Sequence, residues 1–342
     1  MKSIVLVEPG SLRATTQPEA APPGPGEALV RVHRVGVCGT DIHAYRGRQP
    51  FFTYPRIPGH ELGVEVLAVG EGVSGVGAGD RCAVEPYLNC GRCIACRRGK
   101  PNCCTDLKVL GVHVDGGLRE RFIVPAAKLH RSATLSFEQL ALVETLGIGA
   151  HAVDRAALAA GETVAVLGAG PIGLATLQFA LAAGARVLAV DVDARRLAFC
   201  RDRLGLGAEA TINAGETPDV AHRLAELTNG DLPTAVFDAT GNAASMANAF
   251  NFAAPGGRLV FVGLFPGDVT FNDPHFHRRE LTLLASRNSR PDDFRRIISL
   301  VESGRVDTTP WITHRAGLDD VPARFPGWTE PAAGVVKAMI EL

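Results

Sequence analysis

The sequence has almost no net charge. Among its 342 residues, 35 Lys and Arg stand against 36 Asp and Glu, which gives a formal net charge of -1. A chain so balanced has no broad basic field to attract nucleic acid or an anionic membrane. We therefore expect a small-molecule ligand, and neither nucleic acid nor a membrane among its partners.

The N-terminus lacks a long apolar run. The first residues, MKSIVLVEPG, reach Glu8 after a short apolar stretch, which is too brief for the core of a signal peptide or for a membrane span. Internal repeats and low-complexity segments are also absent. We expect a cytoplasmic protein that is long enough for two domains, each with its own core.

The first half of the chain is rich in short strand signals. Residues 18–26 contain four prolines and two glycines, which prevent a helix or a strand there. Short β-branched runs separated by Gly-rich turns follow at 28–32, 62–69, 81–84 and 118–124. This half is predicted to form a β-barrel-like domain.

From about Gly161 the pattern changes to that of a parallel sheet. Continuous apolar runs at 163–167, 187–190, 234–237, 258–262 and 281–285 alternate with helical patterns. Such alternation predicts an α/β fold, a doubly wound sheet of six parallel strands. A helix is expected from Pro291 to about Ser303, and residues 335–342 could return to the first domain.

Eight cysteines in a cytoplasmic chain indicate a metal site or catalysis before disulfides. Five of them fall between Cys90 and Cys104. One tight loop could wrap a tetrahedral zinc ion in the thiolates of Cys90, Cys93, Cys96 and Cys104, and a zinc with four thiolates is structural. Cys103 adjoins Cys104 and could replace it on spacing alone.

A glycine motif follows the first apolar run of the second half. Gly168, Gly170 and Gly173 stand between this run and a helical stretch, the setting of a dinucleotide-binding loop. Gly168 permits a tight turn, Gly170 lets the backbone approach the pyrophosphate, and Gly173 allows the helix to pack on the strand. The diphosphate would bind at the N-terminus of the helix.

Asp191 ends the next apolar run, 18 residues after Gly173. Its carboxylate can accept hydrogen bonds from both ribose hydroxyls and would repel a 2′-phosphate, so NAD is predicted in preference to NADP. Arg195 and Arg196 oppose this prediction, because a guanidinium beside the acid could bind a 2′-phosphate. The alternative for them is a solvated first turn of helix.

Cys38 and His60 are candidate ligands of a second zinc ion. A thiolate and an imidazole suit zinc, and a catalytic site needs three protein ligands. Glu144, just before the nucleotide-binding half, could supply the third. Glu61, next to His60, could be a ligand or could bond to one. The residues alone do not decide between Glu144 and Glu61. They also leave open that Cys38 and His60 are structural residues that bind no metal.

Thr40 and His43 follow Cys38 by two and five residues. A threonine hydroxyl can accept a substrate proton while donating onward, and a histidine with a pKa near neutrality can release that proton to solvent. These two residues are predicted to form a proton relay; the alternative for His43 is a surface residue. Asp41 could orient a ring nitrogen or cap a helix.

Together these motifs resemble the zinc-dependent medium-chain dehydrogenases. The similarity rests on residues 36–41, His43, Gly59-His60-Glu61, the four cysteines and the glycine motif, and it covers essentially the whole chain. It implies a GroES-like catalytic domain at 1–145 with a structural zinc lobe at about 88–106, a Rossmann NAD-binding domain at 146–286, and a return to the catalytic domain at 287–342. It also implies a homodimer or homotetramer with two zinc ions per subunit.

The resemblance also assigns roles. The cysteine spacing of the family favours Cys104 over Cys103. In its polyol and threonine branch the third zinc ligand is a glutamate that matches Glu144, which leaves Glu61 as a catalytic carboxylate beside the metal. Thr145 stands where that branch commonly has proline. The further cofactor contacts implied are Pro171, Ile172, Arg196, Thr240 and Gly263.

A narrower similarity concerns the substrate. Residues 43–56, 111–117, 261–265 and 286–288 resemble bacterial sugar-acid dehydrogenases, which oxidise aldonates such as L-galactonate or L-gulonate at C5. Arg287 aligns with a substrate-contacting arginine of the polyol enzymes, and a guanidinium suits a carboxylate. The alternative is a surface ion pair. The residues His113 and Tyr45 are predicted to line the same pocket.

The expected function is oxidation of a secondary hydroxyl of a sugar acid by NAD⁺. Zinc held by Cys38, His60 and Glu144 would lower the pKa of the substrate hydroxyl. Thr40 and His43 would carry the proton away, and hydride would pass to the nicotinamide. The alternatives are a polyol or L-threonine dehydrogenase, a quinone-reductase-like enzyme without catalytic zinc, and a non-enzymatic use of the fold.

Overall fold

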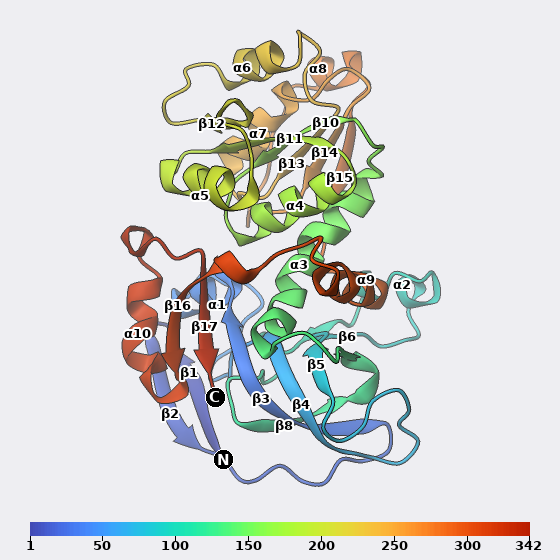
Figure 1. The fold of residues 1–342 in the computed structure, drawn as a ribbon, viewed down its shortest axis with the longest axis vertical. Coiled ribbons are helices and arrows are strands. Elements are labelled where there is room, and N and C mark those ends of the chain that lie inside the picture. Colours follow the sequence, from blue (N-terminus) through green and yellow to red (C-terminus); the bar gives the residue numbers. More distant parts are fainter. The chain divides into compact units, whose positions relative to one another are not determined.

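The computed structural model describes residues 1–342, which form two compact units (Figure 1). The first unit combines residues 1–145 with residues 289–342, and the second contains residues 146–288. Helix α3 (Phe137–Ala156) contains the first boundary. None of the helices combines the length and the apolar composition that crossing a membrane requires.

A seven-stranded sheet is the framework of the first unit. Its strands follow the order β16-β17-β3-β4-β5-β9, and β8 pairs with β3 as well. The strands are β3 (Glu27–Val37), β4 (Glu61–Val69), β5 (Arg81–Val84), β8 (Arg121–Pro125), β9 (Leu129–Arg131), β16 (Ile312–Gly317) and β17 (Lys337–Glu341).

Strand β3 shows why these residues form a sheet with one buried face. Ala28, Val30 and Val32 alternate with less buried residues along it, which is the period of a strand that packs one face on a core. All three belong to the apolar core of the first unit. The last strand of the chain, β17, pairs antiparallel with the C-terminal end of β3, so both ends of the chain build this unit.

Smaller elements complete the first unit. Strand β1 (Lys2–Glu8) pairs with β2 (Ser11–Thr16), and β6 (Tyr87–Leu88) pairs with β7 (Lys108–Val109). Its remaining α-helices are α1 (Gly39–Tyr45), α2 (Ile94–Arg97), α9 (Pro291–Glu302) and α10 (Val321–Trp328).

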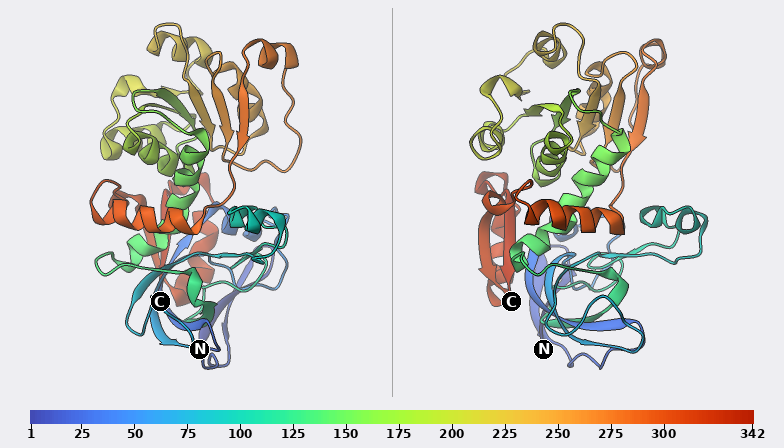
Figure 2. Two further views of the ribbon diagram at one scale, coloured as in Figure 1. Left: turned by 90° about the vertical axis from the view of Figure 1, so that its right-hand side faces the viewer. Right: turned by 45° about the vertical axis from the view of Figure 1, so that its right-hand side comes forward.

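The second unit is a six-stranded parallel sheet with helices packed on it (Figures 1 and 2). Its strands are β10 (Thr163–Leu167), β11 (Arg186–Asp191), β12 (Thr211–Asn213), β13 (Ala235–Asp238), β14 (Arg258–Phe261) and β15 (Thr282–Ala285). Its helices are α4 (Pro171–Ala182), α5 (Ala194–Leu204), α6 (Val220–Leu227), α7 (Ala243–Asn248) and α8 (Asp273–Arg278).

The strand order β12-β11-β10-β13-β14-β15 is that of a Rossmann fold. The order reverses between β10 and β13, and ligands of such sheets bind there, beyond the carboxyl ends of the strands. The predicted doubly wound parallel sheet is confirmed. Five of its strands coincide with the apolar runs; the sixth, β12, buries only Ile212 and has no such run.

Candidate active site and metal centres

Four cysteines gather in the segment between β6 and β7. The sulfur atoms of Cys90, Cys93, Cys96 and Cys104 all lie within 4.8 Å of one another. The neighbouring Cys103 is exposed and does not belong to this group. Backbone N–H groups, that of Cys96 foremost, lower the pKa of Cys93 to about 5. A set of thiols so close together, one of them readily ionised, fits a tetrahedral zinc ion.

A neutral amide connects this cysteine lobe (about residues 88–106) to a buried ion pair. The Asn89 side-chain amide lies 3.6 Å from the sulfur of Cys96, and its carbonyl oxygen accepts a hydrogen bond of 2.9 Å from Lys128. Lys128 also binds Glu85 at 2.5 Å. The lobe is therefore linked by hydrogen bonds to the buried pair of Lys128 and Glu85. Sequence spacing alone did not identify these three residues.

The two adjacent cysteines should differ sharply when replaced. Cys104→Ser removes one thiolate of the group, so we expect the purified protein to lose one bound zinc per chain. Cys103→Ser is the matched control and should leave the zinc content and the thermal midpoint unchanged, because its thiol lies outside the group. Elemental analysis of both variants checks this. If Cys103→Ser lost zinc and Cys104→Ser kept it, Cys103 and not Cys104 would be the fourth ligand.

Cys38, His60 and Glu61 form a second cluster, with one potential ligand atom from each within 4.8 Å of the others. Cys38 follows β3 and is the N-cap of α1, while Glu61 begins β4 directly after His60. The pairing of β3 with β4 places these strand ends together. At Gly36 a Cβ atom would lie 2.0 Å from an oxygen of Glu61, so glycine is required for this approach.

Asp41 lies behind the imidazole of His60. The Nδ1 atom of His60 is 3.7 Å from Oδ1 of Asp41, and both atoms are buried without a hydrogen-bond partner. The other oxygen of Asp41 accepts a hydrogen bond of 2.9 Å from the backbone of Cys38. A histidine with a carboxylate behind one ring nitrogen presents the other nitrogen to a metal. The pair thus fits a metal-ligating imidazole.

Lys337 neutralises Glu61. The ammonium of Lys337 lies 2.7 and 2.8 Å from the two carboxylate oxygens of Glu61, and the two residues are 1% and 0% exposed. Lys337 comes from β17, so sequence spacing did not relate it to this cluster. Glu61 lies near Cys38 and His60, but both of its oxygens are already bonded to a cation.

Glu144 is held differently. It lies in α3 and is buried, and it accepts a hydrogen bond from the hydroxyl of Tyr87 through one oxygen, Oε1. Burial raises the pKa of Glu144, whereas the charge of nearby His60 lowers it. With Glu61 paired to Lys337, the sulfur of Cys38 and the carboxyl group of Glu144 remain as donors, and such donors fit a zinc ion. Glu144 is not within the 4.8 Å group, so its ligand role stays a proposal.

The two relay candidates lie in helix α1, next to Cys38. Thr40 is partly buried and His43 is exposed. Loss of hydration foremost, and then the charges of Arg46 and Arg48, lower the pKa of His43. A neutral imidazole at physiological pH can accept a proton, which supports the predicted role of His43.

The three residues predicted to contact the substrate have different surroundings. Arg287 is an exposed residue of the second unit that follows β15. His113 belongs to the first unit, and its Nδ1 accepts a hydrogen bond of 3.1 Å from the backbone of Val109. The ring of Tyr45 packs at 5.2 Å from that of Phe325. Their common role in one pocket stays a prediction.

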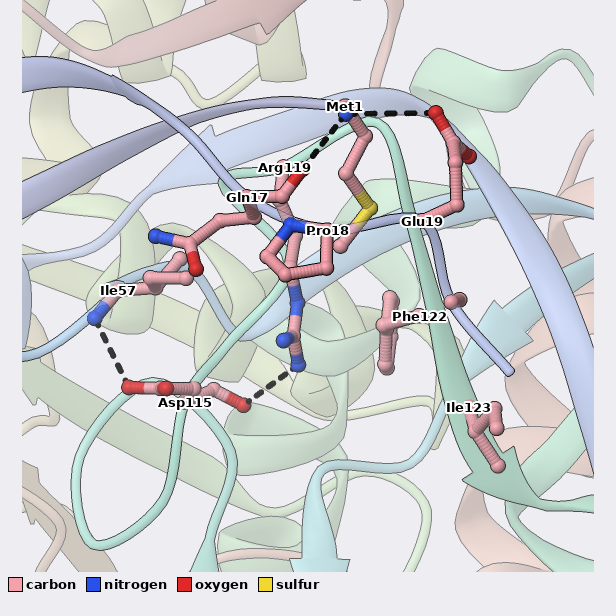
Figure 3. Close-up of a pocket in the computed structure, with 10 residues that line it drawn as sticks. Met1, Gln17, Pro18, Glu19, Ile57, Asp115, Arg119, Phe122 and Ile123 are labelled. Carbon is pink, nitrogen blue, oxygen red and sulfur yellow. Dashed lines mark hydrogen bonds and ion pairs between the residues drawn. The ribbon is translucent and has the colours of Figure 1, made fainter.

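A pocket of about 350 Å³ lies elsewhere in the first unit (Figure 3). It is lined by Met1, Gln17, Pro18, Glu19, Ala20, Ile57, Asp115, Arg119, Phe122 and Ile123. Asp115 accepts a hydrogen bond of 3.1 Å from the backbone of Ile57. None of the predicted site residues lines this pocket, so it is separate from the metal cluster.

The glycine motif of the second unit has the geometry of a dinucleotide-binding loop. Gly168 has φ of +88°, a conformation that favours glycine. A Cβ at Gly173 would lie 1.7 Å from the carbonyl oxygen of Gly168. Gly170 caps α4, which begins at Pro171 and continues through Ile172. The helix N-terminus and the bare backbone fit a bound pyrophosphate.

Asp191 supports this loop. Its two carboxylate oxygens accept backbone hydrogen bonds from Ala169 at 2.6 Å and Asp193 at 2.8 Å, and an ionised carboxylate has further lone pairs for ribose hydroxyls. A guanidinium nitrogen of Arg196 lies 3.6 Å from Asp191. The acid therefore already neutralises the arginine that could attract a 2′-phosphate, which favours NAD. Arg195 is bonded to Asp193 instead.

Two more predicted cofactor residues lie at the carboxyl ends of neighbouring strands. The hydroxyl of Thr240, just after β13, donates to Asp238 at 2.6 Å. Gly263, just after β14, leaves no room for a side chain, since its Cβ would lie 2.3 Å from the backbone nitrogen of Gly241. Asp238, which holds Thr240 in place, was not predicted.

The comparisons with known proteins place the chain in a family. Residues 24–134 match the family model for the alcohol dehydrogenase GroES-like domain, and residues 171–303 match that for zinc-binding dehydrogenases. Together the two models span more than half of the chain. The protein belongs to the zinc-binding alcohol dehydrogenases, and its two units are a GroES-like domain and a Rossmann domain.

Individual relatives narrow the comparison. The chain is 41% identical to L-galactonate-5-dehydrogenase of Escherichia coli K12, over 92% of this chain and 91% of that protein. It is 33% identical to 2-dehydro-3-deoxy-L-galactonate 5-dehydrogenase of Pseudoalteromonas atlantica, over 94% and 93%. The alcohol dehydrogenase RspB of E. coli CFT073, solved with NADH, has a TM-score of 0.92 and 31% identity over 100% of this chain and 99% of that one.

These relatives confirm the predicted class of enzyme and its cofactors. The protein is an oxidoreductase that uses zinc and NAD and acts on the CH–OH group of a small molecule of the polyol or sugar-acid kind. The non-enzymatic use of the fold is excluded.

Proposed function

We propose that the protein oxidises a secondary hydroxyl of an aldonate, such as L-galactonate or L-gulonate, to a ketone with NAD⁺. Similarity to L-galactonate-5-dehydrogenase along 92% of this chain is the observation that carries the proposal. Arg287 would provide the guanidinium that recognises the carboxylate of the substrate.

Within this proposal each metal has its own residues. Cys90, Cys93, Cys96 and Cys104 would hold the structural zinc, and Cys38, His60 and Glu144 would hold the catalytic one. When bound, the catalytic zinc supplies a Lewis acid that lowers the pKa of the substrate hydroxyl, and NAD⁺ supplies the hydride acceptor. This gives two zinc ions per chain.

The other site residues position groups or move protons. The hydroxyl of Thr40 accepts the proton from the substrate, and the neutral imidazole of His43 takes it onward to solvent. Glu61 remains paired with Lys337, so that its charge does not compete with that of Glu144. Asp191 accepts hydrogen bonds from the adenosine ribose, and the N-terminus of α4 binds the pyrophosphate.

A substrate panel tests the proposal. We expect L-galactonate or L-gulonate to give the highest kcat/KM among aldonates, polyols and L-threonine, with NAD⁺ preferred over NADP⁺. Arg287→Ala should lower kcat/KM by about 10- to 100-fold for the aldonate, the effect of losing a charge-assisted hydrogen bond. Activity on uncharged polyols should be unaffected by that change. Inert aldonates combined with rapid oxidation of polyols would overturn the substrate assignment.

A homodimer or homotetramer and a cytoplasmic location stay predictions. They follow from the resemblance of the sequence to its family and from the N-terminal sequence. Light scattering after gel filtration would measure the number of subunits.

A further inference from the structure

Tyr87 is a buried tyrosine whose hydroxyl is bonded to one carboxylate. It begins β6, is 3% exposed, and donates its hydroxyl hydrogen to Oε1 of Glu144. A carboxylate oxygen can only accept, so in this pair the phenol is the donor and Glu144 the acceptor.

The two acidic side chains of the cluster are held in contrasting ways. Both oxygens of Glu61 are bonded to the ammonium of Lys337. Glu144 receives a hydrogen bond on one oxygen, from a neutral donor, and its second oxygen accepts none. The charge of Glu61 is thus already balanced by an ammonium, whereas the one side-chain hydrogen bond of Glu144 comes from an uncharged phenol that restricts its orientation.

The backbone of Tyr87 is itself fixed. Tyr87 pairs with Val109 across the two-stranded ribbon β6–β7, and the carbonyl oxygen of Pro86 accepts a hydrogen bond of 3.0 Å from Leu110. The ribbon leads directly into the cysteine lobe, whose first thiol is Cys90. The phenol thus projects from a structurally restrained strand, as a positioning group requires.

We propose that Tyr87 is a positioning residue of the active site, which orients Glu144 as the third ligand of the catalytic zinc. The inference rests on the proposed function, because it assumes that a zinc ion binds Cys38 and His60. A residue that bonds to a metal ligand restricts the geometry of that ligand, and its loss typically weakens metal binding by about 10- to 100-fold. Tyr87 has this relation to Glu144.

The test compares Tyr87→Phe with Tyr54→Phe. Tyr54 is the matched control, because its hydroxyl donates to a backbone oxygen, that of Ala44 at 2.5 Å, and not to a carboxylate. We expect Tyr87→Phe to weaken binding of the catalytic zinc by about 10- to 100-fold in chelator competition. It should also change the visible absorption of Co²⁺ substituted at that site. Tyr54→Phe should change neither measurement, and in both variants the zinc of the lobe should stay bound.

Separate outcomes bear on the two proposals. Unchanged zinc affinity and an unchanged Co²⁺ spectrum in Tyr87→Phe would overturn the role of Tyr87 while leaving the proposed function intact. A single zinc per chain in the unsubstituted protein would instead contradict the proposed function. If Tyr87→Phe fails to fold, replacing Tyr87 by 3-fluorotyrosine makes the test with the phenol kept in place. Fluorine changes the donor strength of the hydroxyl, so the Co²⁺ spectrum should shift, and an unchanged spectrum would refute the inference.

Discussion

Replacing His60 by alanine should lower kcat for alcohol oxidation by at least about 1,000-fold, which corresponds to about 4 kcal/mol of transition-state stabilisation. The substitution removes the imidazole that lies beside Cys38 and in front of Asp41. Without it the cluster keeps too few ligands to hold zinc, and the Lewis acid is lost. The affinity for NADH should not change, because the dinucleotide loop belongs to the second unit.

Three measurements separate this prediction from a general loss of structure. Steady-state kinetics gives kcat, the fluorescence of NADH gives its Kd, and elemental analysis should show one zinc per chain in place of two. His222→Ala is the control, since the side chain of His222 is 71% exposed on α6; it should behave like the unsubstituted protein. Normal turnover by His60→Ala protein with only the lobe zinc would refute the catalytic role of the metal.

Most of the parallel sheet could be predicted from the sequence because its central strands are continuous apolar runs. Strands β10, β11 and β13 are buried on both faces, and continuous apolar runs are typical of a parallel sheet. The same argument fails for β12. Strand β12 has three residues, of which only Ile212 is buried. It is a strand because it pairs with β11, and such pairing cannot be predicted from sequence periodicity.

The two metal sites also differ in how far they could be predicted from the sequence. The cysteine lobe is local, with its ligands inside a span of 15 residues from Cys90 to Cys104, so spacing predicted the group except for the choice between Cys103 and Cys104, which the family resemblance decided. The choice between Glu61 and Glu144 was not local. It depends on Lys337, which is 276 positions from Glu61, and on Tyr87, which is 57 positions from Glu144. Only the fold brings these partners together.

Lys337→Met should lower the free energy of unfolding of the first unit by about 3–5 kcal/mol, the usual result of removing one partner of a buried ion pair. Methionine has a similar volume, so the effect reports charge and not a cavity. Glu61 would remain 0% exposed with neither of its present hydrogen bonds from Lys337. Both tryptophans, Trp311 and Trp328, belong to the first unit. Their fluorescence in urea therefore follows this unit alone.

Two further variants identify the cause. Lys2→Met removes an exposed pair with Asp319, 2.7 Å apart, and should leave the urea midpoint nearly unchanged, because solvent screens such a pair. The double variant Glu61→Gln/Lys337→Met removes both charges, so it should recover much of the stability that Lys337→Met loses. Equal destabilisation by the single and the double variant would show that the loss comes from packing and not from an unpaired carboxylate.

The variant Lys337→Met also tests whether Glu61 can bind the metal. In Lys337→Met the carboxylate of Glu61 has no cation partner, and it lies within 4.8 Å of the other potential ligands in its cluster. Zinc binding should then neutralise it, so the destabilisation should be smaller in zinc-loaded protein than in protein stripped of metal, by the difference in zinc binding energy. Equal destabilisation in the two forms would mean that Glu61 stays apart from the metal even when its lysine is gone, which would leave Glu144 as the carboxylate ligand.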